Sequence, residues 1–158
     1  MPFLDSFGCV LVGSKVVMLC GYNGVKGQFL NSVYEYDIDS NTLTVLYAEA
    51  EGDKSKSIFR IYAGPIPRAN CSAASDGADA IYLFGGNQSD NRLNDLWRFD
   101  LSSKHYTQVE DKEELRPVVR SGHTVNFYDG KLYIFGGIHE VTWELDDLHI
   151  YDLKVESF

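Results

Sequence analysis

The most regular feature of the sequence is a short run of apolar residues that ends in two glycines. The run occurs at residues 80–86 and 131–137, and the two copies lie 51 positions apart. A weaker copy at residues 15–21 comes first and has Cys20 where the others have the first glycine. A continuous run of this kind predicts a strand that is buried on both faces, and the glycines allow backbone conformations that a side chain would block.

Three alternating segments follow these runs, and each ends in aspartate. They are residues 31–37, 94–100 and 146–152, and their alternation predicts half-buried strands. Further strands are predicted upstream of two of the apolar runs, at residues 69–74 and 121–127, and downstream of two alternating segments, at residues 43–46 and 106–109. Since no segment shows the apolar spacing of a helix, the sequence predicts an all-β chain of four-stranded antiparallel units. We expect the recurring glycines and aspartates to be structural: Gly21, Gly85, Gly86, Gly136, Gly137, Asp37, Asp100 and Asp152.

Short motifs within these units carry a resemblance to a known family. Arg120 begins an Arg-Ser-Gly-His segment, a Gly-Gly pair closes the run at 131–137, and Asn-Asp-Leu stands at 94–96. Together they resemble the kelch repeat, in which each unit forms one blade of a β-propeller. The resemblance implies a kelch-type β-propeller segment of about three four-stranded antiparallel blades. Unit 1 departs most, with one glycine of the pair, and the family's fourth-strand tryptophan is replaced by Leu43, Tyr106 and Phe158.

The repeat also sets the expected boundaries. Blade 1 is expected over residues 4–47, blade 2 over 67–110 and blade 3 over 117–158, with an inserted loop within 47–66. The last unit ends six residues after its closing aspartate, so we expect its fourth strand to be incomplete. Propellers close with roughly four to eight blades, so we expect these three not to form a closed ring alone. Missing chain or self-association would then be needed to complete the ring.

Charge and composition narrow the choice of partner. The chain has 14 Lys+Arg against 23 Asp+Glu, and its net charge of −9 argues against nucleic acid and anionic membranes. No apolar stretch is long enough to span a bilayer, and the start of the chain lacks the features of a signal peptide, so we expect a cytoplasmic protein, with the nucleus also open. The odd number and wide spacing of Cys9, Cys20 and Cys71 argue against a disulfide framework or a zinc site.

Catalytic motifs are absent from the sequence, and we expect neither an enzyme nor a bound cofactor. One cluster has the side-chain types of a metal site, namely His139, Glu140, Glu144, Asp146, Asp147 and His149. However, Asp146 and Asp147 fall where each unit turns into its third strand, a position at which an Asx side chain commonly bonds its own backbone. We therefore expect no metal, and we interpret His123 as a hydrogen-bonded structural residue.

Loops at one end of the expected propeller hold the candidate binding residues, because propeller sheets position loops that the core does not need. Arg68 and Arg120 precede the first strands of two units, where an arginine suits an acidic peptide but can equally brace neighbouring blades. The loops after the Gly-Gly pairs add Asn87, Gln88, Arg92, His139, Glu140 and Trp143. Trp143 in a polar loop is a candidate interface anchor.

The leading hypothesis is a non-enzymatic protein-interaction module or scaffold, as the kelch resemblance implies, with a protein partner that bears acidic residues. One alternative is a propeller metalloenzyme that resembles copper-containing oxidases and whose site is completed by further blades. A second alternative is a purely structural subunit of a large complex, which the open strand edges would serve.

Overall fold

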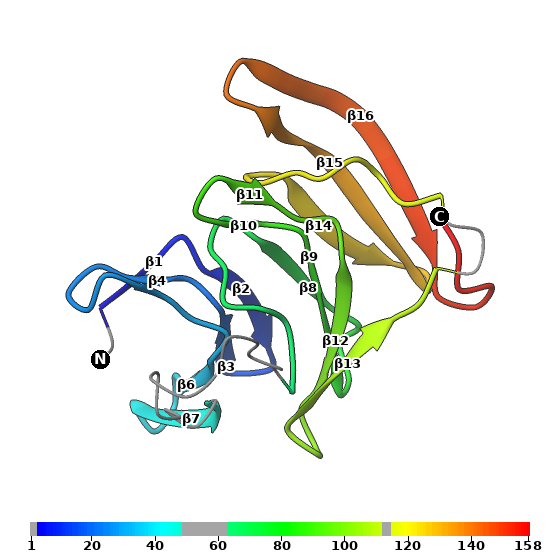
Figure 1. The fold of residues 1–158 in the computed structure, drawn as a ribbon. Helices are drawn as coiled ribbons and strands as arrows, with labels where there is room; N and C mark the ends of the chain where they lie inside the picture. The colour runs from blue at the N-terminus through cyan, green and yellow to red at the C-terminus, as the bar shows by residue number, and fades with distance from the viewer. Residues whose placement is uncertain (1–2, 49–62, 112–114) are drawn as a thin grey trace.

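The computed structural model describes residues 3–48, 63–111 and 115–158, and within them the chain forms strands and no helix. Three antiparallel sheets stand side by side like the blades of a fan (Figure 1). The predicted all-β fold is thus confirmed, and the sheets do not close into a ring. No described segment forms a helix that could cross a membrane. Most of the insertion predicted within 47–66 lies outside the described residues.

Each sheet is one repeat of the sequence. Blade 1 has the spatial order β2 (Gly8–Val12), β3 (Lys15–Leu19), β6 (Val33–Asp37), β7 (Thr42–Tyr47). Blade 2 has the order β8 (Ser72–Ser75), β9 (Ala80–Phe84), β12 (Leu96–Asp100), β13 (His105–Val109). Blade 3 has three strands, β14 (Thr124–Tyr128), β15 (Lys131–Glu140) and β16 (Trp143–Asp152). The loops after the buried runs add the short strands β4 (Tyr22–Asn23), β5 (Gln28–Phe29), β10 (Asn87–Gln88) and β11 (Asn91–Arg92), and β1 (Leu4–Asp5), which precedes β2, pairs with β4.

The three blades share one register. Leu19 pairs with Val33 in blade 1, as Phe84 does with Leu96 in blade 2 and Phe135 with Leu148 in blade 3. The next backbone position is left-handed in every blade, with φ of 62° at Cys20, 58° at Gly85 and 64° at Gly136. Cys20 therefore occupies the place of the first glycine, as the alignment of the repeats predicts, although this φ favours glycine.

Neighbouring blades pack face to face through apolar side chains. One core joins blades 1 and 2, and it contains Val17, Leu19, Val33, Ala73, Leu83 and Phe99. A second core joins blades 2 and 3, and it contains Tyr82, Phe84, Leu96, Val125, Ile134 and Tyr151. Blade 2 thus buries one face against blade 1 and the other against blade 3, which is why its buried run shows no polar alternation.

Repeated polar contacts fix the ends of the strands. The Asp37 carboxylate accepts a hydrogen bond from the Ser40 amide at 2.8 Å, and Asp100 accepts one from the Ser103 amide at the same distance. Asp152 accepts one from the Lys154 amide at 2.9 Å. These bonds close the turn after each third strand. The hydrogen bond from Ser103 is the main cause that lowers the pKa of Asp100 to about 2.

Candidate functional site

The hairpins that follow the buried runs gather at one end of the blades. In Figure 1 the β10–β11 hairpin and the far ends of β15 and β16 lie at this end, which we call the hairpin face. A cleft of about 430 Å³ opens there, between blades 2 and 3. Its lining comes from both blades and consists of Asn70, Asn87, Ser89, Asp90, Arg92, Ser121, Gly122, Ile138 and Val141.

The polar groups of the cleft are held by hydrogen bonds. Asn70 Nδ2 donates to Asn87 Oδ1 at 2.8 Å, and Asn87 Nδ2 donates to the Ser89 carbonyl at 2.8 Å. Arg92 is the one basic residue in the lining, and its Nε donates to Ser121 Oγ at 3.2 Å. Within the described part of the chain, the two terminal nitrogens of Arg92 make no hydrogen bond or ion pair. The cleft therefore offers a guanidinium group that is oriented by its hydrogen bond to Ser121, and its two terminal nitrogens are open to a ligand.

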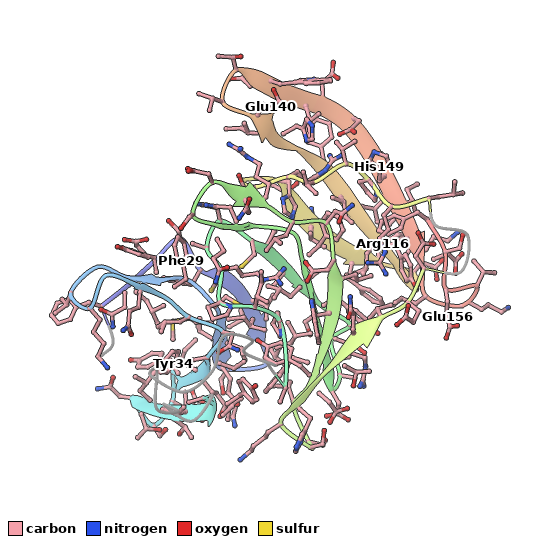
Figure 2. All side chains as sticks on the ribbon, in the orientation of Figure 1. Phe29, Tyr34, Arg116, Glu140, His149 and Glu156 are labelled. Carbon is pink, nitrogen blue, oxygen red and sulfur yellow. The ribbon has the colours of Figure 1, made fainter. Side chains whose placement is uncertain are left out.

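Trp143 lies on the blade 3 hairpin, whose Ile138 and Val141 line the cleft. Its indole meets the His139 ring edge to face, with the ring centroids 5.2 Å apart. His139 Nδ1 in turn lies 2.8 Å from the Val119 carbonyl, to which it donates because a carbonyl only accepts. Trp143 remains 57% exposed, and Val141 at the tip of the same hairpin is 90% exposed. The hairpin thus presents apolar surface on a braced support, and Figure 2 shows Glu140 near its tip.

Arg68 and Arg120 lie beneath this face, fully buried. The two terminal nitrogens of Arg68 donate to both carboxylate oxygens of Asp95, and Nη1 also donates to the Gly85 carbonyl at 3.0 Å. Arg120 repeats the arrangement with Asp147, at 2.6 and 2.9 Å. Neither guanidinium is available to a partner at the surface. The side-chain partners of each arginine lie in its own blade, so this geometry supports a bracing role within the blade, whereas the sequence suggested bracing between neighbouring blades.

Both aspartates are held in the charged form. Burial raises the pKa of the Asp95 carboxyl, but the hydrogen bonds and positive charge of Arg68 outweigh it, and the pKa lies below its ordinary value. The hydrogen bond from Arg120 is the main cause that holds the pKa of Asp147 well below its usual range. His149 Nε2, 2.9 Å from Asp147, adds a second contact.

Sequence reasoning missed the role of Asp95 and Asp147 as arginine partners. We expected Asp147 to bond its own backbone, whereas its carboxylate contacts Arg120 and His149. The signal was a spacing of 27 residues from arginine to aspartate in two repeats. A second signal was that the strand registers place Leu4 and Ser32 at these positions in blade 1, so the arginine and the aspartate are replaced together. Among the described residues, no three His, Cys, Asp or Glu side chains are placed to hold a metal ion.

His123 lies at the seam between blades 2 and 3. Its Nε2 is 3.1 Å from the Phe84 carbonyl, and its ring packs edge to face on the Phe84 ring. A Cβ at Gly85 would lie 2.8 Å from His123 Cε1, so the glycine makes room for the imidazole. Burial, with a further contribution from the positive charge of Arg120, lowers the pKa of His123 to about 4. The neutral ring is therefore part of the seam at neutral pH.

The corresponding seam between blades 1 and 2 contains two cysteines instead. Cys20 and Cys71 are buried in its core, whereas Cys9 is exposed on β2. Burial raises the pKa of Cys20 well above its ordinary value. The hydrogen bond from Cys20 lowers the pKa of Cys71. The seam thus replaces a glycine and histidine pair with two thiols that contact each other.

We expect the exposed Cys9 to react faster with a thiol reagent than the buried Cys20 and Cys71. In dilute folded protein, one thiol per chain should react readily with a chromogenic disulfide reagent, and the other two should react only in denaturant, because burial blocks attack. Absorbance of the released thiolate, followed with and without guanidinium chloride, measures this. Cys9→Ser should abolish the early phase. An early phase that persists in this variant would show that Cys20 or Cys71 is accessible.

Comparisons with known proteins agree with this architecture. A family model, the KLHDC2/KLHL20/DRC7 Kelch-repeats domain, matches residues 6–158. Tip elongation aberrant protein 3 of Schizosaccharomyces pombe is 32% identical over 135 residues, 82% of this chain and 11% of that protein. Host cell factor 2 of Homo sapiens is 37% identical over 134 residues, 82% of this chain and 16% of that protein. Human leucine-zipper-like transcriptional regulator 1 is 26% identical over 160 residues, 98% of this chain and 17% of that protein.

The repeated antiparallel sheets, their shared register and their stacking define a partial β-propeller of the kelch type. With the family match over residues 6–158, the chain belongs to the kelch-repeat family, as its motifs predicted. Members of this family typically serve in protein interactions. The chain spans 11 to 17% of the length of the three relatives described above.

Proposed function

We propose that this chain is a non-enzymatic interaction module that holds a protein partner on the hairpin face. One observation carries the proposal: the blade 3 hairpin that lines a cleft with fixed polar groups also carries an exposed tryptophan, on loops that the cores do not need. Rigid aromatic side chains next to oriented hydrogen-bonding groups are typical of protein-binding surfaces. The sheets beneath supply the rigid support.

The partner presents a peptide segment with an acidic side chain. Its carboxylate would accept hydrogen bonds from the two terminal nitrogens of Arg92, one to each carboxylate oxygen. An apolar side chain of the same segment would pack on Trp143, and the Asn87 and Asn70 amides supply polar groups for its backbone. Because Arg68 and Arg120 are buried, Arg92 is the residue on which this charge preference depends.

A binding role is favoured over the two alternatives by the same contacts. His139 and His149, which a copper site would need, are engaged with the Val119 carbonyl and with Asp147. The structural-subunit alternative uses the open blade edges and leaves the cleft without a role. We place the module in the cytoplasm or nucleus, and we infer that further blades, from missing chain or from self-association, complete its ring.

Selection from a displayed peptide library tests this proposal. We expect enriched peptides to contain Asp or Glu near an apolar residue and to bind more weakly as salt rises. Arg92→Ala and Trp143→Ala should each raise the dissociation constant about tenfold or more, since each removes an anchor. Isothermal titration calorimetry with synthetic peptides measures the effect.

Lys104→Ala and Ile38→Ala are the matched controls, because both residues are exposed in turns between the third and fourth strands of their blades. They should leave the affinity unchanged. Peptides that bind the Arg92 and Trp143 variants as tightly as the parent protein would refute the assignment of the hairpin face. A basic consensus would refute the acidic partner.

A further inference from the structure

Blade 3 ends in an apolar face that is open in the described structure. Phe135 and Leu148 pair across β15 and β16 and are 52% and 56% exposed. Tyr133 and Ile150 form the next pair on the same face. Figure 1 shows no further sheet beyond these strands. The face therefore consists of large side chains in a regular two-strand array.

The same positions are buried in the other two blades. Leu19 and Val33 of blade 1 are fully buried, and Phe84 and Leu96 of blade 2 are at most 1% exposed. In each case the cover is the following blade, whose strands complete the apolar core. The register thus identifies the open face of blade 3 as one half of an interface that the chain already makes twice.

The backbone of blade 3 is also set for a following blade. Between blades 1 and 2, the Gly21 amide donates to the Arg68 carbonyl at 2.8 Å, and the Arg68 amide donates to the Leu30 carbonyl at 3.1 Å. The same two bonds recur between blades 2 and 3. In blade 3, Gly137 and Leu145 stand in these places and pair with each other, and φ of Gly137 is 99° against 101° for Gly21. The Gly137 backbone thus has the conformation of Gly21, whose N–H bonds the following blade.

Gly136 supports the same conclusion. Its counterpart Gly85 is crowded by blade 3, because a Cβ there would lie 2.8 Å from both the Arg120 carbonyl and His123. At Gly136 the one near atom among the described residues belongs to its own blade, the Leu145 carbonyl at 3.0 Å. At Gly136 the space that blade 3 fills beside Gly85 is open, although Gly136 has the same left-handed backbone conformation as Gly85.

Blade 1 carries the other half of the interface. The alternation of its strands places Cys9, Leu11, Val16, Met18, Tyr34, Tyr36, Leu43 and Val45 on the face directed away from blade 2, and of these Met18 is buried. Leu11 is 63% exposed on this face, and Figure 2 shows Tyr34 there on β6. In blades 2 and 3 the equivalent face is the one buried against the preceding blade. The described blades thus present two outer faces that repeat the two sides of the seam between neighbouring blades.

We propose that two copies of this chain associate head to tail, with blade 3 of each copy against blade 1 of the other, to close a six-bladed ring. Six blades fall within the roughly four to eight that propellers use. The contact joins two different surfaces, and the two-fold arrangement uses both surfaces of both copies, so no apolar face is left open. The proposal does not depend on a ligand at the hairpin face, since the two sets of residues are separate.

Sedimentation velocity over a range of concentrations tests the ring. We expect the full chain to sediment with twice the mass of one chain and to dissociate on dilution. Phe135→Asp and Leu11→Asp should each raise the dissociation constant at least about a hundredfold, because a charge would enter an apolar contact. Val155→Asp is the matched control, since this residue is exposed on blade 3 in the turn after β16. Near-ultraviolet circular dichroism of each variant confirms that its blades remain packed.

Mixing the variants separates head-to-tail from other pairings. Phe135→Asp and Leu11→Asp chains together have one intact interface, so the mixture should associate more strongly than either variant alone. Cys9 lies on the blade 1 face, and its alkylation in the parent chain should slow as the concentration rises. A parent chain that is monomeric at high concentration would overturn the proposal. A dimer that Phe135→Asp breaks and Leu11→Asp leaves intact would also overturn it, because such a dimer pairs blade 3 with blade 3.

Discussion

Replacing Arg68 with leucine is expected to lower the free energy of unfolding by about 3 kcal/mol, although the change puts an apolar side chain in place of a charged one at a buried position. The substitution leaves the Asp95 carboxylate with the Trp97 indole, whose Nε1 donates at 2.6 Å, as its remaining side-chain partner. It also removes the donor to the buried Gly85 carbonyl. An uncompensated buried charge and an unsatisfied carbonyl both favour the unfolded chain.

Blade 1 indicates how the loss can be reversed. Blade 1 has Leu4 and Ser32 where blade 2 has Arg68 and Asp95. The same blade architecture is therefore built with an uncharged pair at these two positions. The double variant Arg68→Leu with Asp95→Ser should therefore be more stable than Arg68→Leu alone, with a coupling energy of about 2 kcal/mol. Denaturant unfolding of both single variants and the double variant measures this term.

Arg98→Leu is the matched control for the Arg68 substitution. Arg98 makes its 2.9 Å ion pair with Asp100 at the surface, where its side chain is 37% exposed. Pairs of this kind contribute about 0 to 1 kcal/mol, so the same change should have a small effect there. An Arg68→Leu variant that loses no more stability than Arg98→Leu would contradict the bracing role.

The fold could be predicted because the repeat imposes a strict register. Each buried run must lie between two apolar neighbours, and a shift by one residue would turn its side chains to the wrong face. The spacing of the glycines and of the closing aspartates then aligns the blades, and it even places Cys20 correctly at a left-handed position. The first strand of blade 1, Gly8–Val12, lies within the expected span of 4–47, although unit 1 lacks the Arg-Ser-Gly-His motif that marks this strand in unit 3.

The candidate site could be predicted only in part. The sequence predicted Asn87, Arg92 and Trp143 in loops after the buried runs, and the structure places them on the β10–β11 and β15–β16 hairpins, because loop positions follow from strand positions. It could not decide whether Arg68 lies at the surface, since this depends on a carboxylate 27 residues away and on the depth of both groups. The cleft itself forms between two blades, and no single repeat encodes it.

Acidification from pH 7.5 to pH 5 is expected to lower the free energy of unfolding by about 2 kcal/mol through His123 alone. In the folded chain its pKa is about 4, against an ordinary value of 6.5. The unfolded chain therefore takes up a proton as the pH falls below 6.5, while the folded chain stays neutral until about pH 4. Proton uptake by the unfolded state lowers stability, so the contribution is complete above pH 6.5 and is lost between 6.5 and 4.

His123→Gln isolates this effect, because an amide can donate to the Phe84 carbonyl but does not titrate. Guanidinium chloride unfolding at pH 7.5, 6 and 5 should show a slope for the parent chain that is largely absent in the variant. Aspartates with lowered pKa, such as Asp95 and Asp147, act mainly below about pH 4 and do not interfere. His105→Gln, at an exposed position of β13, should leave the slope unchanged. Parallel pH profiles for the parent and His123→Gln would show that the seam between blades 2 and 3 admits a charged imidazole, contrary to the burial that the structure shows.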